Sequence, residues 1–399
     1  MNGLTNELHL LLLCTSADLS SDDEANIRRI LAGGIDWTGF VQTAINHGLA
    51  GLAGQVLGGV ASDLVPEDIS AAFATYLERT RERNRALLDE LLRILDALAG
   101  HGIEAIPLKG PVLAIQAYGD LALREFQDLD FLVRDRDLAS ATRSLIELGY
   151  SHREKLSAAQ LALIHRLQGQ EILFGRDGGA ALEPHTRLTS MKLAFDIDHE
   201  ALWERARTID LDGRRILSLA AEDELIALAV HGGKELWWNV KWACDIAAFA
   251  RSHQDLDWRL AFLRARQQGC FRMLLLAAAL AREFFHAAVP EWVVEAERAD
   301  PLIARMMDQV LARWRADDPV GPPSSKTVSW NLLQLHDGAS RRARYVVKTV
   351  FLPGPQHVAM MALPRALSFG YIPIKLVHDA VALPLWRVYQ QLRGPASRV

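Results

Sequence analysis

The spacing of hydrophobic positions divides the chain into helical stretches on both sides of a mixed segment. In the N-terminal quarter, apolar residues recur every three or four positions, which is the period of an amphipathic helix. The apolar run at residues 8–14 predicts the buried face of a first helix. Ser21 to Glu24 follows the pattern of a capping box, and a long helix is expected to begin at Pro66. The helical pattern returns near Glu222.

Short apolar runs interrupt the helical pattern in the second quarter of the chain. They predict strands at residues 103–108, 129–133, 171–174 and 180–188. Helices are expected after the first two strands, and Ser157 caps another helix. Asp177-Gly178-Gly179 is a hairpin turn signal between the last two strands. This mixture predicts the α+β class, with a small mixed β-sheet core flanked by N-terminal and C-terminal helical regions.

The same pattern divides the chain into four regions. We expect an N-terminal helical region at residues 1–100, an α+β core at 101–215, a helical subdomain at 216–316, and a linker with C-terminal helices at 317–399. The linker is predicted from the Pro-, Gly- and Ser-rich sequence DDPVGPPSSKTVS, which no regular helix or strand accommodates.

Composition narrows the class of protein. The 399 residues carry 44 basic and 49 acidic side chains, and half are hydrophobic, which is typical of a globular protein and argues against sequence-blind nucleic-acid binding. Three widely spaced cysteines exclude a disulfide framework and a thiolate zinc site, and they fit a cytoplasmic protein. No stretch has the length of a transmembrane segment. Residues 358–386 predict buried or amphipathic helices, with docking on a membrane surface as the alternative.

Candidate chemistry is concentrated around one predicted strand. Asp128 and Asp130 project from the same face of it, because side chains alternate along a strand. Two crowded carboxylates repel one another unless a cation lies between them, and Mg²⁺ prefers carboxylates together with phosphate oxygens. Glu183 lies in a later strand, so three acids on adjacent strands could hold two metal ions.

The residues before this strand favour phosphate binding. Lys109 and Gly110 form a turn that leads into a helix, and the helix start offers unpaired N–H groups to an anion. Arg124 follows shortly before the acids and could neutralise phosphate charge. Each feature alone is common in proteins, and their order along the chain is the specific signal.

That order resembles the polymerase-β-like nucleotidyltransferase superfamily. Within it, the chain looks most like a bacterial family with an LKG…R…DxDxLV signature and a later strand with a hydrophobic residue, an acid, any residue and His. The matching residues are Leu108-Lys109-Gly110, Tyr118, Arg124, residues 128–133 and Leu182-Glu183-Pro184-His185. Two departures are a Lys-Gly turn where many members have Gly-Gly or Gly-Ser, and a Glu where Asp is more usual.

The resemblance implies a reaction and a set of site residues. An Mg²⁺- or Mn²⁺-dependent enzyme would move a nucleoside monophosphate from an NTP to an acceptor hydroxyl and release pyrophosphate. By the same resemblance Gly110 supplies the turn, and such proteins occur in bacteria, often near biosynthetic genes. The implied metal ligands are Asp128, Asp130 and Glu183, and the implied phosphate contacts are Lys109 and Arg124.

A second group of residues follows in the helical region. Lys234 and Lys241 lie close in sequence to an aromatic trio of Trp237, Trp238 and Trp242, and Lys241 lies four residues from Asp245 on one helix face. We expect a nucleotide cleft between the core and this region, with Trp238 stacking on the base and the lysines on phosphate. The alternative is a Trp-rich packed helix with a surface ion pair. Gly232-Gly233-Lys234 is not a P-loop, because Glu follows where Ser or Thr is required.

Other functions stay open. The acceptor could be a small molecule, a peptide or a protein. A toxin-like nucleotidyltransferase that modifies tRNA or protein is an alternative enzyme. A catalytically silent scaffold that binds a peptide or partner is an alternative of another class, although it would not need paired carboxylates, which are electrostatically costly.

Overall fold

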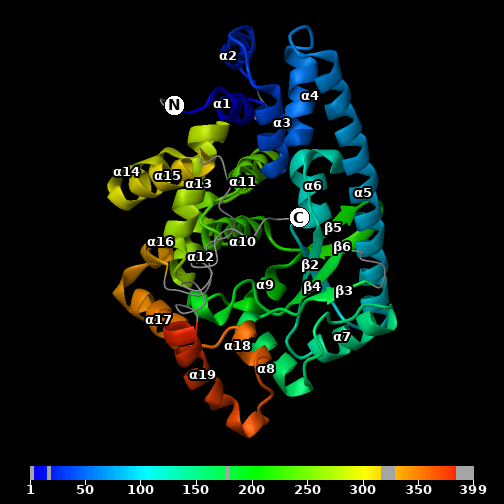
Figure 1. Ribbon diagram of the computed structural model, residues 1–399, viewed down its shortest axis with the longest axis vertical. Helices are drawn as coiled ribbons and strands as arrows, with labels where there is room; N and C mark the ends of the chain where they lie inside the picture. The colour runs from blue at the N-terminus through cyan, green and yellow to red at the C-terminus, as the bar shows by residue number, and fades with distance from the viewer. Residues whose placement is uncertain (1–3, 16–18, 176–179, 316–328, 383–399) are drawn as a thin grey trace.

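The computed structural model describes residues 4–15, 19–175, 180–315 and 329–382. The predicted Asp177-Gly178-Gly179 turn and all but the last residue of the predicted linker lie outside these ranges. Within them, no helix combines the length and apolar character that a bilayer span requires. The fold is α+β: a small mixed sheet lies among many helices, as predicted (Figure 1).

In the described residues before the sheet, the chain forms five helices. They are α1 (Asn6–Leu13), α2 (Ser21–Ala32), α3 (Trp37–Asn46), α4 (Ala50–Val60) and α5 (Glu67–Gly100). The apolar run in α1 is buried, as predicted. The capping box of α2 begins one residue earlier than predicted, because Ser20 is the extended N-cap and exchanges hydrogen bonds with Asp23, whereas Ser21 is already helical.

The central sheet has four strands in the order β1-β2-β4-β3. The strands are β1 (Ala105–Leu108), β2 (Asp128–Val133), β3 (Leu173–Phe174) and β4 (Ala181–His185). Only the β2–β4 pair is parallel, and its register places Asp130 beside Glu183. All four predicted strands are therefore present, with shorter bounds for three of them.

Helices surround this sheet and connect its strands. They are α6 (Gly110–Tyr118), α7 (Leu138–Glu147), α8 (Ala158–Gln168) and α9 (His199–Arg205). Apolar side chains on one sheet face, such as Phe131 and Leu182, share a core with α5 and α7. The acids project from the opposite face, because they alternate with these residues along β2 and β4. Ser157 caps α8 together with Gln160, as predicted.

A second sheet was not predicted from the sequence. Its strands β5 (Arg207–Leu211) and β6 (Arg214–Ser218) form an antiparallel hairpin. Asp212 and Gly213 connect them, both with positive φ, as a two-residue hairpin turn requires.

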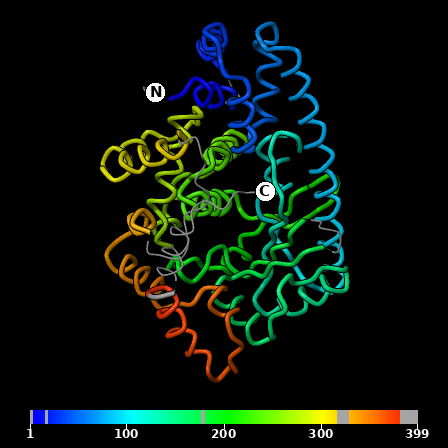
Figure 2. The backbone as a smooth tube through the Cα atoms, viewed as in Figure 1, coloured from blue at the N-terminus to red at the C-terminus, as the bar shows by residue number. Residues whose placement is uncertain are grey.

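The remaining helices complete the molecule. They are α10 (Ala221–Lys234), α11 (Val240–Ser252), α12 (Trp258–Gln268), α13 (Phe271–Phe285), α14 (Glu291–Ala299), α15 (Pro301–Trp314), α16 (Trp330–Leu335), α17 (Gly338–Phe351), α18 (Pro355–Ala359) and α19 (Tyr371–Val377). One apolar cluster joins α1–α5 to α10–α16. The backbone trace places α2 and α17–α19 at opposite ends of the molecule (Figure 2).

Candidate active site

The Lys109-Gly110 turn between β1 and α6 has an unusual backbone conformation. Lys109 has a φ of 54° and Gly110 a φ of 45°. Positive φ is costly for a residue with a side chain and acceptable for glycine, so the surrounding structure must hold Lys109 in place. The carboxyl of Glu224 on α10 is buried close to Lys109, and burial raises the pKa of that carboxyl to about 7. The turn is thus fixed between the sheet and the helical region.

Lys109 carries the cation closest to the predicted acids. Its Nζ lies 2.6 Å from Oδ2 of Asp130. Burial alone would raise the pKa of the Asp130 carboxyl, but Lys109 and then His185 outweigh it and hold that pKa well below its usual range. Asp130 is only 6% exposed, so this ion pair is largely shielded from water.

Three groups that could ligate a cation meet above β2 and β4. One ligand atom from each of Asp130, Glu183 and His185 lies within 4.8 Å of the other two. The Nε2 atom of His185 is 3.4 Å from Oδ1 of Asp130 and 3.7 Å from Oε2 of Glu183. Gln170 donates a 2.7 Å hydrogen bond to Glu183 and orients its carboxylate.

This donor set fits a divalent cation. Both ring nitrogens of His185 face oxygens at 3.4 Å, Nδ1 the carbonyl of Arg187 and Nε2 the Asp130 carboxylate, and with the ring proton on Nδ1 the Nε2 atom can ligate a cation. Three acceptors that face one another repel unless a proton or cation lies between them. Burial and the negative charge of Asp130 raise the pKa of Glu183. Two carboxylates and an imidazole suit Mn²⁺ as well as Mg²⁺.

The predicted ligand set and this group overlap in part. The parallel register brings Asp130 and Glu183 together, whereas Asp128 lies outside the group and lines the neighbouring cavity. His185 was not predicted as a ligand. Its position two residues after Glu183 on the same strand places both side chains on one face, and this spacing was the available signal.

A cavity of about 490 Å³ adjoins the acids and is called the central cavity below. One wall comes from the turn and from β2, and the other from α10, α11 and the chain between them. The residues lining it are Ile45, Asn46, Gly48, Lys109, Gly110, Arg124, Glu125, Phe126, Gln127, Asp128, His231, Glu235, Trp238, Asn239, Lys241 and Trp242. Lys109 therefore contacts Asp130 and also faces this cavity.

Lys241 and Trp238 supply the far wall of the central cavity. Nζ of Lys241 donates to the carbonyl of Glu125 at 2.9 Å. Burial, followed by the charge of Arg124, lowers the pKa of Lys241 to about 8. The Trp238 ring packs edge-on against Trp242, with centroids 5.3 Å apart. Lys234, the third predicted contact in this region, does not line the cavity, and burial and Lys109 lower its pKa.

Arg124 is engaged by a carboxylate rather than left open to solvent. Its Nε and Nη2 atoms donate to the two oxygens of Asp245 at 2.8 and 2.9 Å, and Tyr118 donates to the same carboxylate at 2.8 Å. The surface ion pair considered between Asp245 and Lys241 is therefore wrong, because Asp245 turns inward toward α6. Arg124 also lines the central cavity.

The chain between α10 and α11 explains why a glycine is needed at position 232 on α10. Leu236 and Trp237 both have a φ of 54°, and the Trp237 side chain is fully buried. A Cβ on Gly232 would lie 2.4 Å from the Trp237 ring. The glycine is thus required for packing and not for phosphate binding, which agrees with the rejection of a P-loop.

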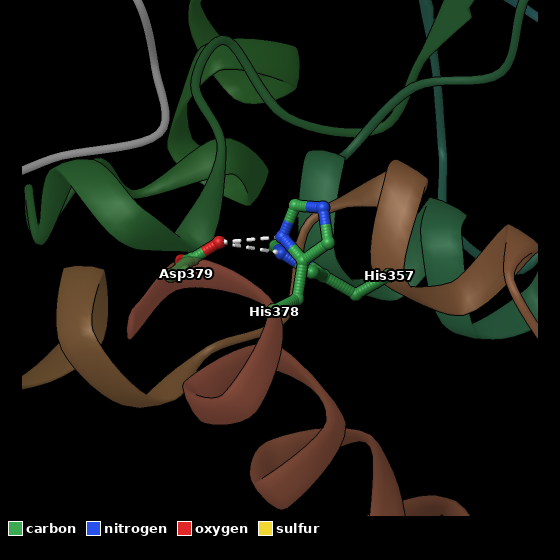
Figure 3. Close-up of side chains that lie close together, drawn as sticks. All are labelled: His357, His378 and Asp379. Atoms are coloured by element: carbon green, nitrogen blue, oxygen red, sulfur yellow. Dashed lines mark hydrogen bonds and ion pairs between the residues drawn. The ribbon is translucent and has the colours of Figure 1, made fainter. Parts of the chain in front are cut away.

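A second His/Asp group lies among the C-terminal helices. His357 and His378 both contact Oδ1 of Asp379, at 3.0 and 2.9 Å (Figure 3). The N–H of Gly354 donates to Nδ1 of His357, so the ring proton belongs on Nε2, the atom that faces Asp379. Lys375 also pairs with Asp379. The geometry fits a hydrogen-bonded anchor better than a metal site.

Comparisons with known proteins bear on the chemistry of this site. No curated protein sequence matches the chain. Residues 33–286 match the model of a family described as uncharacterised nucleotidyltransferase. The match spans the α+β core with its acids and the helices that form both walls of the central cavity. The chain belongs to this nucleotidyltransferase family.

Proposed function

We propose that the protein transfers a nucleoside monophosphate from an NTP in the central cavity to an acceptor hydroxyl, with pyrophosphate as the second product. One observation carries the proposal: Lys109 lies between the Asp130, Glu183 and His185 group and a cavity whose far wall offers a lysine and a tryptophan. A triphosphate with its base needs these two kinds of surface, one for charge and one for stacking.

Asp130, Glu183 and His185 would hold Mg²⁺ or Mn²⁺, and Asp128 would face the nucleotide from the cavity wall. When bound, the ion supplies charge neutralisation and Lewis-acid activation to the transferred phosphoryl group. The chain itself contributes positioning. Lys109 and Gly110 bind phosphate at the start of α6, Lys241 binds phosphate from the opposite wall, and the Trp238 ring stacks on the base.

Glu183 is the group best suited to accept the proton of the acceptor hydroxyl. Gln170 holds Oε2 of Glu183 in place, so its carboxylate, or a water that it orders, is positioned to accept this proton. Gln170 also lines a second cavity of about 360 Å³ formed largely by α8 and the chain on both sides of it. We place the acceptor on this side of Glu183, opposite the nucleotide.

The proposal is tested with a double variant, Asp128→Asn with Asp130→Asn. Purified protein is incubated with each α-labelled NTP in turn, with Mg²⁺ and a cell lysate as the source of acceptors. Wild-type protein should label an acceptor and release pyrophosphate, and the double variant should do neither, because it lacks the charge that binds the cation. Circular dichroism checks that the variant is folded, since Lys109 loses its partner.

The chain offers a matched control with the same spacing. Asp255-Leu256-Asp257 repeats the Asp-Leu-Asp sequence away from the site, and Asp257 caps α12, a position that Asn also fills well. Asp255→Asn with Asp257→Asn should keep full activity. Full labelling by the Asp128 and Asp130 double variant would end the enzymatic proposal and leave the scaffold alternative.

A further inference from the structure

Large apolar side chains project into solvent at one end of the molecule. They are Met360, Met361, Leu367, Phe369 and Val377, and this set is called the apolar tip. Phe369 is 68% exposed and Val377 is 63% exposed. The chain between α18 and α19 carries most of the set and forms the end of the molecule away from α2 (Figure 1). Monomeric proteins rarely leave so many large apolar side chains together in water.

The backbone of the apolar tip is well anchored. Tyr371 donates to the carbonyl of Met361 at 2.9 Å, and the N–H of Leu363 donates back to the Tyr371 hydroxyl at 3.0 Å. Gln160 of α8 donates to the carbonyl of Val358, which is itself buried. The inner side chains of the segment are thus packed, and the exposed ones are presented outward by a held backbone.

The C-terminal helices from residue 338 onward, which carry the apolar tip, are basic, whereas the chain as a whole is acidic. Within the described residues 338–382 there are six Lys or Arg and one acid, Asp379, and two of the arginines, Arg341 and Arg344, pair with Asp196, although the full chain has a net charge of −5. His357 and His378 already contact that single acid (Figure 3), and Lys375 pairs with it as well. Arg365 lies within the apolar tip, is exposed, and has no ion-pair partner in the part of the chain that the structure describes.

We propose that the apolar tip docks on an anionic phospholipid bilayer. Met, Leu, Phe and Val side chains would enter the boundary between headgroups and acyl chains, while Arg365 and Arg166, which are both exposed and line one hollow beside the tip, contact the negative headgroups. Insertion of apolar side chains favours a bilayer over nucleic acid, which would be bound through cations and aromatic stacking surfaces. The binding is peripheral and independent of the proposed reaction.

Flotation with vesicles tests the proposal on the full-length protein. Vesicles contain phosphatidylcholine alone, or phosphatidylcholine with one quarter phosphatidylglycerol. The protein should float with the anionic vesicles, and binding should fall as salt is raised. Leu367→Ser and Phe369→Ser should each lower the partition coefficient about tenfold, because a large apolar side chain no longer enters the bilayer.

The matched control is Leu263→Ser. Leu263 is 54% exposed on α12 and Leu367 is 48% exposed, so both variants remove a similar side chain from the surface. Leu263→Ser should leave vesicle binding unchanged. Failure of the wild-type protein to float, or equal losses for the three variants, would overturn the proposal. Release from vesicles by single-stranded RNA, with no effect of the serine substitutions, would also overturn it and assign the basic region to nucleic acid.

Discussion

At the scale of single residues, Lys109 decides the charge balance of the site. Crowded carboxylates call for a cation, and a metal ion was the cation expected from the sequence. The structure shows that the chain supplies one of its own, since the Lys109 ammonium lies 2.6 Å from Asp130. A divalent cation at Asp130 and Glu183 would therefore bind next to a positive charge, which weakens metal binding in the absence of nucleotide.

Replacing Lys109 with Met should strengthen metal binding. The substitution removes the neighbouring ammonium, so the Kd for Mn²⁺ should fall by about threefold to tenfold, measured by calorimetry without nucleotide. Mn²⁺ should also raise the Tm of Lys109→Met more than that of the wild type, because the buried Asp130 carboxylate has lost its partner. Lys109→Arg, which keeps the charge, should resemble the wild type. Weaker Mn²⁺ binding by Lys109→Met would show that Lys109 helps to assemble the site.

Lys241→Ala should weaken binding of a non-hydrolysable NTP by about 1–3 kcal/mol, the usual loss for a hydrogen bond to a charged group. The pKa of Lys241 is about 8, so its charge is lost as pH rises through 8. Wild-type affinity should therefore fall several-fold between pH 7 and pH 9, while Lys241→Arg stays level over that range. Calorimetric titration at each pH measures both effects.

An exposed lysine, Lys155, provides the control for that experiment. Lys375 is unsuitable because it is buried and paired with Asp379, so its removal would disturb the C-terminal helices. Lys155→Ala should bind the NTP analogue with wild-type affinity. Equal affinities for the Lys241 and Lys155 variants would show that the nucleotide binds outside the central cavity.

At the scale of elements, Gly232 shows how closely α10 packs against the chain that follows it. Gly232→Ala should lower the free energy of unfolding by about 1–3 kcal/mol, because the new methyl group overlaps the buried Trp237 ring. Gly58→Ala is the control, since its Cβ would meet nothing within 4 Å and helix α4 gains from the substitution. Urea denaturation compares the two. A neutral Gly232→Ala would mean that Trp237 can move.

Local sequence signals predicted most of the helices and strands. They missed the β5–β6 hairpin, which only its turn residues indicate, and they misplaced the cap of α2. The strands of the central sheet, the buried face of α1 and the cap of α8 follow from hydrophobic period and cap residues. The β5–β6 hairpin was missed although Asp212-Gly213 is a strong turn signal, because its strands are short and rich in charged residues. The capping box of α2 was predicted one residue too late, because Ser20 and Ser21 offer the same hydroxyl and either could be the N-cap.

The candidate site was predictable only where neighbours in space are also close in sequence or belong to one strand pair. Alternation along β2 and the later strand acid indicated Asp130 and Glu183, and the register brings them together. The partner of Arg124 could not be predicted, because Asp245 lies in a distant helix and the pairing depends on how that helix packs. The ion pair between Lys109 and Asp130 depends in the same way on the strained turn.

At the scale of the whole molecule, the Arg124–Asp245 pair joins the α+β core to α11. Both side chains are almost fully buried, at 4% and 1% exposure. Arg124→Met or Asp245→Asn should each cost about 3–5 kcal/mol of unfolding free energy, because the remaining partner keeps an unpaired buried charge or an unsatisfied donor. The double variant should lose less than the two single losses combined, as denaturant titrations would show. Additive losses would mean that the pair does not couple the two parts.

The connection between β2 and β4 has a consequence for how this protein can change over evolutionary time. It leaves the sheet after Val133, forms α7 and α8, rejoins the sheet as the edge strand β3, and enters β4 at Ala181, where the parallel ladder holds β4 beside β2. Insertions near α8 can lengthen this connection with only a small increase in the entropy cost of closing the loop. They need not change the register that places Asp130 beside Glu183. Lineages of such proteins can therefore diversify the surface around α8 while Asp130 stays beside Glu183.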